Sequence, residues 1–259
     1  MREEITFNTL LVDAGNTRLK WSYLQDGERS EQQASTYAEG MTVVRAAEST
    51  LTAILQKSDV QRMVVVHVLG DEFSSALKLF CQSNHCELLL VSSAADTYGI
   101  KLAYPNPAHL GADRLVGLAA ARALSAGKAA IIVDCGTAVT VDAITADNVH
   151  LGGLITPGLN LLQRALFQHT QAKHMDTSLV DDPQIFTDNT AAAIGSGCLF
   201  SLVGTIEGIC QRMQHQMAEQ PLKIICGGDA ARLHQWLGDG FVLQPAALMD
   251  GLQAIAEYE

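Results

Sequence analysis

Short apolar runs alternate with apolar residues at helical spacing along the whole chain, a pattern that is typical of an α/β protein. In the first half, apolar runs predict strands at 10–12, 20–24, 63–68 and 87–91, and a weaker one at 32–37. Helical spacing predicts helices at 41–55, 71–81 and 107–124. In the second half we expect strands at 129–133, 139–144, 151–155 and 222–225, and helices at 158–168, 190–217 and after 229.

One strand, turn and returning strand pattern occurs twice. The two turns are Asp13-Ala14-Gly15-Asn16-Thr17 and Asp134-Cys135-Gly136-Thr137-Ala138, and each begins a predicted antiparallel meander. An Asp at the strand end can face a divalent cation, and glycine lets backbone N–H groups approach phosphate oxygens. One such turn is ordinary hairpin chemistry. Two copies, roughly half a chain length apart, indicate a duplicated fold in which both turns grip the phosphates of a nucleotide.

Composition narrows the class of protein. The 259 residues, 48% of them hydrophobic, are enough for two cores. The net charge of −11, with no cluster of Lys and Arg, argues against nucleic acid as a partner. The start Met1-Arg2-Glu3-Glu4 is acidic where a signal peptide is basic, and Arg122 and Lys128 interrupt the richest apolar stretch, so we expect a cytoplasmic protein that does not span a membrane.

The chain has none of several common catalytic patterns. It contains no P-loop, no dinucleotide-binding G-x-G-x-x-G, no G-x-S-x-G elbow and no H-E-x-x-H. Its six cysteines contain no C-x-x-C, so we interpret them as small buried or semi-buried residues in a reducing compartment, with Cys81, His85 and Cys86 as the one local group. Among these kinds of chemistry, phosphate chemistry at the paired turns is the one that the sequence still supports.

A third motif precedes the predicted helix at 107–124. The segment from Tyr104 to Arg114 ends in Leu110-Gly111-Ala112-Asp113-Arg114, which places a carboxylate and a guanidinium side by side near a helix start. Its structural interpretation is an Asp that favours the helix dipole and an Arg in a surface ion pair.

Together these motifs resemble the type III pantothenate kinases, the enzymes that open coenzyme A synthesis in many bacteria. The resemblance runs from Leu11 to about Leu252 and adds Gly152 to Gly158, Thr190 and Gly227-Gly228-Asp229-Ala230 in the same order. His67 departs from the family, in which many members have a Ser-rich segment with Pro at this strand end. The resemblance implies the fold of the acetate and sugar kinase, heat-shock cognate and actin superfamily. We therefore expect an α/β protein of duplicated ribonuclease H-like (actin-like ATPase) domains, at 1–108 and 109–259, with a nucleotide cleft between them.

The resemblance also implies the site. Asp113 is the expected catalytic base, and the expected pantothenate-binding residues are Tyr104, Gly111, Ala112, Arg114 and, from the opposite subunit of a homodimer, Thr190. The expected ATP-binding residues are Asp13, Ala14, Gly15, Asn16, Thr17, Arg18, Leu19, Lys20, Gly136 and Thr137. Asp13 and Asp134 are expected to hold Mg²⁺ or another divalent cation, and the family also uses a monovalent cation, K⁺ or NH₄⁺. For Lys20 the alternative is an exposed strand lysine. For Thr190 it is a helix N-cap or a first-turn residue.

Two other functions stay open at this point. One is a non-catalytic regulator, because the family overlaps with proteins described as Bvg accessory factors; loss of Asp13 or Asp113 would have favoured it, and both are present. The other is a different small-molecule kinase of the same superfamily. The segment from Tyr104 to Arg114 distinguishes a pantothenate kinase from these other kinases, because this segment matches pantothenate kinases specifically. The paired turns alone would not distinguish the two.

Overall fold

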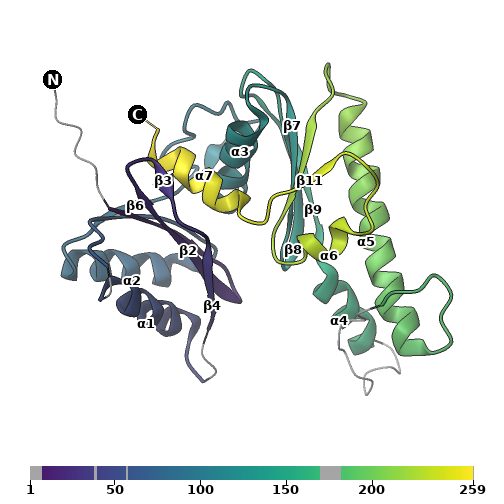
Figure 1. Cartoon of the computed structure of the whole chain (residues 1–259), viewed down its shortest axis with the longest axis horizontal. Coiled ribbons are helices and arrows are strands. Elements are labelled where there is room, and N and C mark those ends of the chain that lie inside the picture. The colour runs from purple at the N-terminus through teal and green to yellow at the C-terminus, as the bar shows by residue number, and fades with distance from the viewer. Residues whose placement is uncertain (1–7, 38–39, 57, 170–181, 259) are drawn as a thin grey trace. The chain divides into compact units, whose positions relative to one another are not determined.

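The computed structural model describes residues 8–37, 40–56, 58–169 and 182–258 (Figure 1). The chain forms two compact units: residues 1–124 with 248–259, and residues 125–247. The predicted boundary of the two ribonuclease H-like domains, between residues 108 and 109, stays a prediction. The boundary between the compact units lies further along the chain, after residue 124, and residues 248–259 belong to the first unit. The acidic start of the chain lies outside the described residues.

The first unit contains one mixed sheet. Its strands are β1 (Thr9–Ala14), β2 (Arg18–Gln25), β3 (Glu28–Arg29), β4 (Gln33–Thr36), β5 (Arg62–His67) and β6 (Glu87–Leu90). The order is β3-β2-β1-β5-β6, and β4 also pairs with β2. Strands β1, β2 and β4 form the predicted antiparallel meander, whereas β5 and β6 are parallel to β1.

The second unit repeats this arrangement. Its strands are β7 (Ala130–Cys135), β8 (Ala138–Ile144), β9 (His150–Pro157), β10 (Leu222–Cys226) and β11 (Phe241–Leu243). The order is β11-β10-β7-β8-β9, with β7, β8 and β9 antiparallel and β10 and β11 parallel to β7. Each sheet is therefore an antiparallel meander extended by two parallel strands on the far side of its first strand. The duplication predicted from the repeated turn is confirmed.

The helices complete the two units. They are α1 (Val43–Leu55), α2 (Gly70–Ser83), a 3₁₀ turn η1 (Pro107–His109), α3 (Ala112–Ser125), α4 (Leu159–His169), α5 (Thr190–Gln214), α6 (Ala230–His234) and α7 (Ala247–Ala256). Helices α1 and α2 lie side by side in the first unit, and α4 contacts α5 in the second (Figure 1). Parallel strands need such crossover connections, and the helices supply them.

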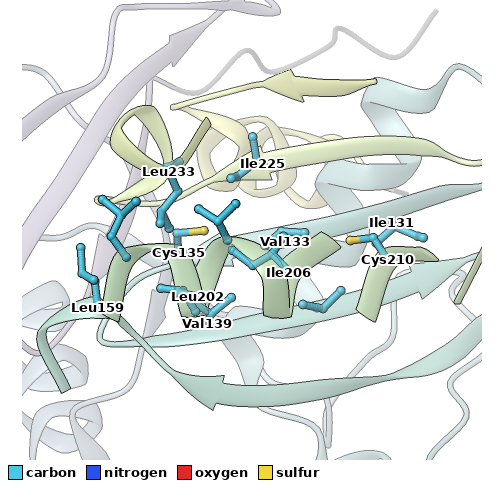
Figure 2. Packing of buried hydrophobic residues seen from close by; sticks show 14 of the residues in the cluster. Ile131, Val133, Cys135, Val139, Leu159, Leu202, Ile206, Cys210, Ile225 and Leu233 are labelled. Carbon is cyan, nitrogen blue, oxygen red and sulfur yellow. The ribbon is translucent and has the colours of Figure 1, made fainter. Parts of the chain in front are cut away.

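Alternating residues of the central strands form the cores. In the first unit, Leu10 and Val12 of β1 pack with Leu51 of α1 and Phe73 of α2. Figure 2 shows the corresponding core of the second unit, where one face of the sheet packs against α5. It includes Ile131, Val133, Val139, Leu202, Ile206 and Ile225. Every residue of β1 is buried, which explains why this strand forms a continuous apolar run.

The structure corrects three details of the sequence prediction. The helix expected over 107–124 is interrupted at Leu110 and Gly111, which separate η1 from α3. The short strands β3 and β11 and the helix α7 were not predicted. The most membrane-like segment is α5 rather than the stretch that Arg122 and Lys128 interrupt: by length and composition α5 could cross a membrane. This is weak evidence, because eight of its residues are buried, as in the core helix of a soluble protein.

Helix α7 belongs to the first unit through specific contacts. Asp250 forms an ion pair with Arg29 of β3, and the main-chain oxygen of Ala256 accepts a hydrogen bond of 3.1 Å from Arg62 of β5. Gly251 lies against α3 so closely that a Cβ there would overlap the carbonyl oxygen of Val116. The absence of a side chain at this position lets the two helices pack.

We predict that Gly251→Ala destabilises the protein, because the added methyl group must push α7 away from α3. Overpacking of this kind costs about 1 to 3 kcal/mol. The matched control is Gly204→Ala in α5, where an added Cβ meets nothing within 4 Å. Because Ala has the higher helix propensity, this control should gain up to about 1 kcal/mol. Thermal unfolding of both variants checks the prediction, and equal stability of the two would contradict it.

Candidate active site

The first repeated turn lies at the carboxyl end of β1, in the first unit. Asp13 stands directly opposite Lys20 in the antiparallel pairing of β1 and β2. The Lys20 ammonium lies 3.1 Å from Asp13 Oδ2, and both side chains are largely buried. The alternative of an exposed strand lysine is therefore wrong: Lys20 places a positive charge beside the carboxylate at the turn.

Tyr37, the residue directly after β4, also holds this turn. Its hydroxyl donates a 2.9 Å hydrogen bond to the carbonyl oxygen of Gly15, and the N–H of Gly15 donates to the carbonyl oxygen of Arg18 at 3.1 Å. Burial, with the charge of Asp13 as a smaller cause, raises the pKa of Tyr37. The hydroxyl therefore stays protonated and remains a donor. Sequence reasoning missed Tyr37, because it follows the weak strand β4 and carries no motif.

The other expected residues of the turn divide by exposure. The side chains of Asn16, Thr17 and Arg18 are exposed and free to meet a ligand in solution. The side chains of Ala14 and Leu19 are fully buried in the core, so these two residues can offer a ligand only their main chain.

The third motif lies where η1 ends and α3 begins. Asn106 caps η1 by accepting a 3.1 Å hydrogen bond from the N–H of Ala108. The buried hydroxyl of Ser93 donates to the carbonyl oxygen of Leu110 at 2.7 Å and so fixes the interruption between η1 and α3. At Gly111 a Cβ would lie 2.5 Å from Asp113 Oδ1. Glycine therefore leaves room for the Asp113 carboxylate.

Asp113 is the carboxyl group with the clearest sign of a functional environment. It lies in the first turn of α3 and accepts a 2.8 Å hydrogen bond from the N–H of Arg114 at Oδ1. Burial raises the pKa of Asp113, and the negative charge of Asp13 adds to the rise, whereas the N–H and the guanidinium of Arg114 oppose it. The structure thus brings Asp13 and Asp113, 100 positions apart in sequence, within electrostatic reach.

Arg114 is buried rather than exposed on a helix surface. Its Nη1 donates a 2.9 Å hydrogen bond to the hydroxyl of Tyr104, and its guanidinium lies 5.7 Å from the centroid of the Tyr104 ring. The structural interpretation as a surface ion pair is therefore wrong. Arg114 and Tyr104 instead form a unit that fixes both side chains beside Asp113.

His67, the departure from the family pattern, lies in register with Ala14 at the carboxyl end of β5. Its Nδ1 accepts a 3.2 Å hydrogen bond from the N–H of Leu69, so the ring proton is on Nε2, which lies 2.9 Å from the hydroxyl of Ser74. Burial lowers the pKa of His67. The neutral ring therefore fixes the link between β5 and α2, next to the first turn.

The second repeated turn lies at the carboxyl end of β7, in the second unit. It is confined by main chain on two sides, where Gly158 and Gly227 approach it. A Cβ on Gly158 would lie 2.6 Å from the carbonyl oxygen of Thr137, and one on Gly227 would lie 2.5 Å from that of Cys135 and would overlap Asp134 Oδ1. These glycines are needed for close approach. Asp134 is half-buried at the strand end, as predicted, and Gly136 and Thr137 form the turn.

Asp229, part of the Gly227-Gly228-Asp229-Ala230 motif of the resemblance, also lies near the second turn. Its N–H donates a 3.0 Å hydrogen bond to the carbonyl oxygen of Cys135. The charges of both Asp134 and Asp229 help to raise the pKa of Cys135, after burial as the main cause. Two carboxylates therefore lie near the second turn, and carboxylate oxygens are the ligands that Mg²⁺ prefers.

Within the described residues no group of three or more His, Cys, Asp and Glu side chains gathers to hold a metal ion. Asp13 belongs to the first unit and Asp134 to the second. Sites that bind Mg²⁺ through one or two carboxylates and the phosphates of a substrate need no such group. The donors present fit that kind of site.

Thr190 opens α5, but it does not cap the helix. The cap is Asn189, whose side chain accepts a 2.9 Å hydrogen bond from the N–H of Ala192. Thr190 is exposed. Of the two structural alternatives for Thr190, the N-cap is therefore wrong, and the first-turn residue is confirmed.

Solved structures with the same architecture identify the fold. An archaeal actin homolog has a TM-score of 0.52 at 14% identity and covers 97% of this chain and 100% of its own. MreB5 of Spiroplasma citri bound to ADP has a TM-score of 0.51 at 9% identity, covering 98% and 96%. A Baf family protein of Campylobacter jejuni, described as a transcriptional activator, has a TM-score of 0.60 at 19% identity, covering 96% and 98%. The chain therefore has the actin-like ATPase fold.

Sequence comparison identifies the family. The profile of the type III pantothenate kinases matches residues 9–212. The type III pantothenate kinase of Nitrosococcus oceani is 35% identical over 254 residues, which cover 96% of this chain and 93% of that protein. That of a Janthinobacterium species is also 35% identical, covering 86% and 87%. The chain belongs to the type III pantothenate kinase family.

Proposed function

We propose that the protein transfers the γ-phosphoryl group of ATP to the primary hydroxyl of pantothenate, which gives 4′-phosphopantothenate in the first step of coenzyme A synthesis. Family membership supports this substrate and reaction. The observation that carries the proposal is Asp113, a half-buried carboxylate that is held by the N–H of Arg114 and lies within electrostatic reach of Asp13. A non-catalytic regulator would not need this pair of carboxylates.

Asp113 is the proposed base. Phosphoryl transfer passes through a loose transition state in most analyses, so the protein mainly aligns the groups and offsets charge. The proton of the attacking hydroxyl leaves late, and Asp113 accepts it on a carboxylate oxygen. Its raised pKa makes it a better acceptor than an ordinary Asp. The N–H of Arg114 holds Oδ1 and fixes the orientation of the carboxylate.

Arg114 and Tyr104 are the proposed walls of the pantothenate site. Sequence reasoning left two roles for Arg114, binding the pantothenate carboxylate or steadying the pocket. Its burial and its hydrogen bond to Tyr104 support the second role. Gly111 and Ala112 belong to the same segment and are proposed to line the pantothenate site, where the lack of a side chain at Gly111 leaves room for the Asp113 carboxylate.

The two repeated turns are the proposed phosphate sites. The first turn offers main-chain, hydroxyl, amide and cationic donors, from Gly15, Asn16, Thr17, Arg18 and Lys20. In the second turn the proposed phosphate donors are Gly136 and Thr137. Asp13 and Asp134 would hold a divalent cation such as Mg²⁺. When bound, this ion offsets phosphate charge and fixes the phosphate orientation. We also propose a monovalent cation, K⁺ or NH₄⁺, since two strand-end carboxylates must otherwise face an anionic nucleotide.

We further propose that the working unit is a cytoplasmic homodimer with the pantothenate site at the subunit interface. Exposed apolar side chains on the edge strand β9 and on α4 support a partner surface in the second unit. They are Leu151, Leu154, Ile155, Leu161 and Leu166. The exposed Thr190, free of a capping role, is then available to bind the substrate of the opposite subunit.

The function is tested by ATP-dependent phosphorylation of pantothenate and of a panel of sugars by the purified protein. We expect product only with pantothenate, because the segment from Tyr104 to Arg114 sets the acceptor. Turnover should require Mg²⁺ and should be faster in K⁺ or NH₄⁺ than in Na⁺ or Tris buffer. Phosphorylation of a sugar instead would point to another kinase of the superfamily. Equal rates in all buffers would contradict the proposed monovalent cation.

Asp113→Asn is predicted to lose most turnover and to keep ATP affinity. The amide preserves the shape of the side chain but cannot accept the proton, and a general base contributes about 10² to 10⁴ in rate. Steady-state kinetics and ATP titration separate the two effects. A variant that keeps more than about a tenth of the wild-type kcat would show that Asp113 is not the base.

Thr190→Val is predicted to lower kcat/KM by roughly five- to a hundredfold, as expected for a lost hydrogen bond worth about 1 to 3 kcal/mol. Stability should change little, because Asn189 supplies the cap. A heterodimer tests the subunit arrangement. One subunit carries Asp113→Asn and the other Thr190→Val, so one site has both defects and the other has neither.

Co-refolded mixtures should therefore be more active than the average of the two mutant homodimers. Formation of the heterodimer is shown independently, by differently tagged subunits that copurify. If the heterodimer forms without any recovery, Thr190 acts within its own subunit or not at all.

A further inference from the structure

The C-terminus of α2 contains the one pair of cysteines that lie close in sequence, Cys81 and Cys86. The helix ends in a Schellman motif. The N–H of Cys86 donates a 2.9 Å hydrogen bond to the carbonyl oxygen of Cys81, and the N–H of His85 donates to that of Gln82 at 3.3 Å. His85 has the left-handed backbone conformation that this motif requires, with φ of 53°. The two cysteines are therefore main-chain neighbours across the turn.

The two side chains occupy the positions at which Schellman motifs commonly have an apolar contact. The interaction between the two thiols shifts the pKa of each. The Cys81 thiol donates a 3.7 Å hydrogen bond to the sulfur of Met63 in β5, and the Cys86 thiol donates a 3.6 Å hydrogen bond to the carbonyl oxygen of Glu87, the first residue of β6. Two cysteines whose Cα atoms are more than about 7 Å apart cannot be bridged without backbone movement. The main-chain hydrogen bond between Cys81 and Cys86 keeps this pair close.

The pair is buried but lies directly beneath the surface. Cys81 is 2% exposed and Cys86 8% exposed, whereas all four residues between them, 82–85, are exposed. Opening the last turn of α2 uncovers the sulfur atoms, and helix ends are among the segments that open at low free-energy cost.

We propose that Cys81 and Cys86 form a reversible intrachain disulfide when the protein meets a hydroperoxide. This property is separate from the kinase reaction, because neither cysteine belongs to the proposed site.

The reaction proceeds in two steps. The Cys86 thiolate attacks the terminal oxygen of the hydroperoxide, the O–O bond breaks, and the peroxide is reduced to an alcohol or water while Cys86 becomes a sulfenic acid. The Cys81 thiol then attacks the Cys86 sulfur, the S–O bond breaks, and hydroxide leaves as water with the Cys81 proton. Two thiols and one hydroperoxide thus give one disulfide, one alcohol or water, and one further water.

The order of the two steps follows from the positions of the two thiols. Cys81 is 2% exposed and its thiol is hydrogen-bonded to Met63, whereas Cys86 is 8% exposed and is the first thiol that a hydroperoxide reaches. The interaction between the thiols also lowers the pKa of Cys86 and raises that of Cys81. Cys86 is therefore the sulfur that ionises first, and the thiolate is the form that attacks. Cys81, which keeps its proton, is the resolving thiol.

The test uses the reduced full-length protein and hydrogen peroxide. We expect two of the six thiols to disappear. Both cysteines lie in the tryptic peptide 79–101, which should lose the mass of two hydrogen atoms, resist alkylation and regain both on treatment with dithiothreitol. Persistence of all six thiols at peroxide concentrations that oxidise free glutathione would overturn the proposal. A loss of thiols that maps outside this peptide would do the same.

Single variants test the order of the steps. Cys81→Ser should leave Cys86 as a sulfenic acid that dimedone traps, and Cys86→Ser should leave Cys81 unreacted. The matched control is Cys210→Ser, which removes another buried thiol, in α5, and should leave the two-thiol loss unchanged. Because the wild-type measurement needs no variant to fold, the proposal can fail on that measurement alone. Oxidation of wild-type Cys86 to a sulfinic acid without a disulfide would also overturn it.

Discussion

The position of β1 and β7 in their sheets is the constraint on which the rest of the structure depends. Each is the strand at which an antiparallel meander meets a parallel extension, so each has a hairpin partner on one side and a crossover partner on the other. The turn after each strand is therefore fixed on both sides. Asp13 and Asp134 lie near the ends of these strands, and sheet pairing by itself sets the positions of their main chain.

The two turns are nevertheless stabilised differently. Side chains hold the first one: Tyr37 bonds the main chain of Gly15, and Lys20 pairs with Asp13. Main chain confines the second one, where Gly158 and Gly227 approach too closely to carry a Cβ. A duplicated fold has thus kept the strand order and the terminal carboxylate, while the surroundings of each turn have diverged.

Most of the strands and helices could be predicted from the sequence, because buried central strands form continuous apolar runs that end in Asp-containing turns. The paired turns and the Asp113 motif could be found for the same reason: their residues are contiguous. Contacts between distant segments could not be predicted. Tyr37 reaches Gly15 only through the pairing of β4 with β2, and Asp113 comes within electrostatic reach of Asp13 only in the folded unit. The interruption at Gly111 was missed because the apolar pattern continues across it.

The return of α7 to the first unit has a consequence for synthesis of the chain. The second unit is continuous, from 125 to 247, whereas the first needs residues 248–259 to cover Val116 and to pair Arg29. During synthesis the N-terminal sheet therefore leaves the ribosome first, but the first unit is complete only when α7 has been made. All residues of the second unit are available before that point. The usual N-to-C order of domain completion is reversed.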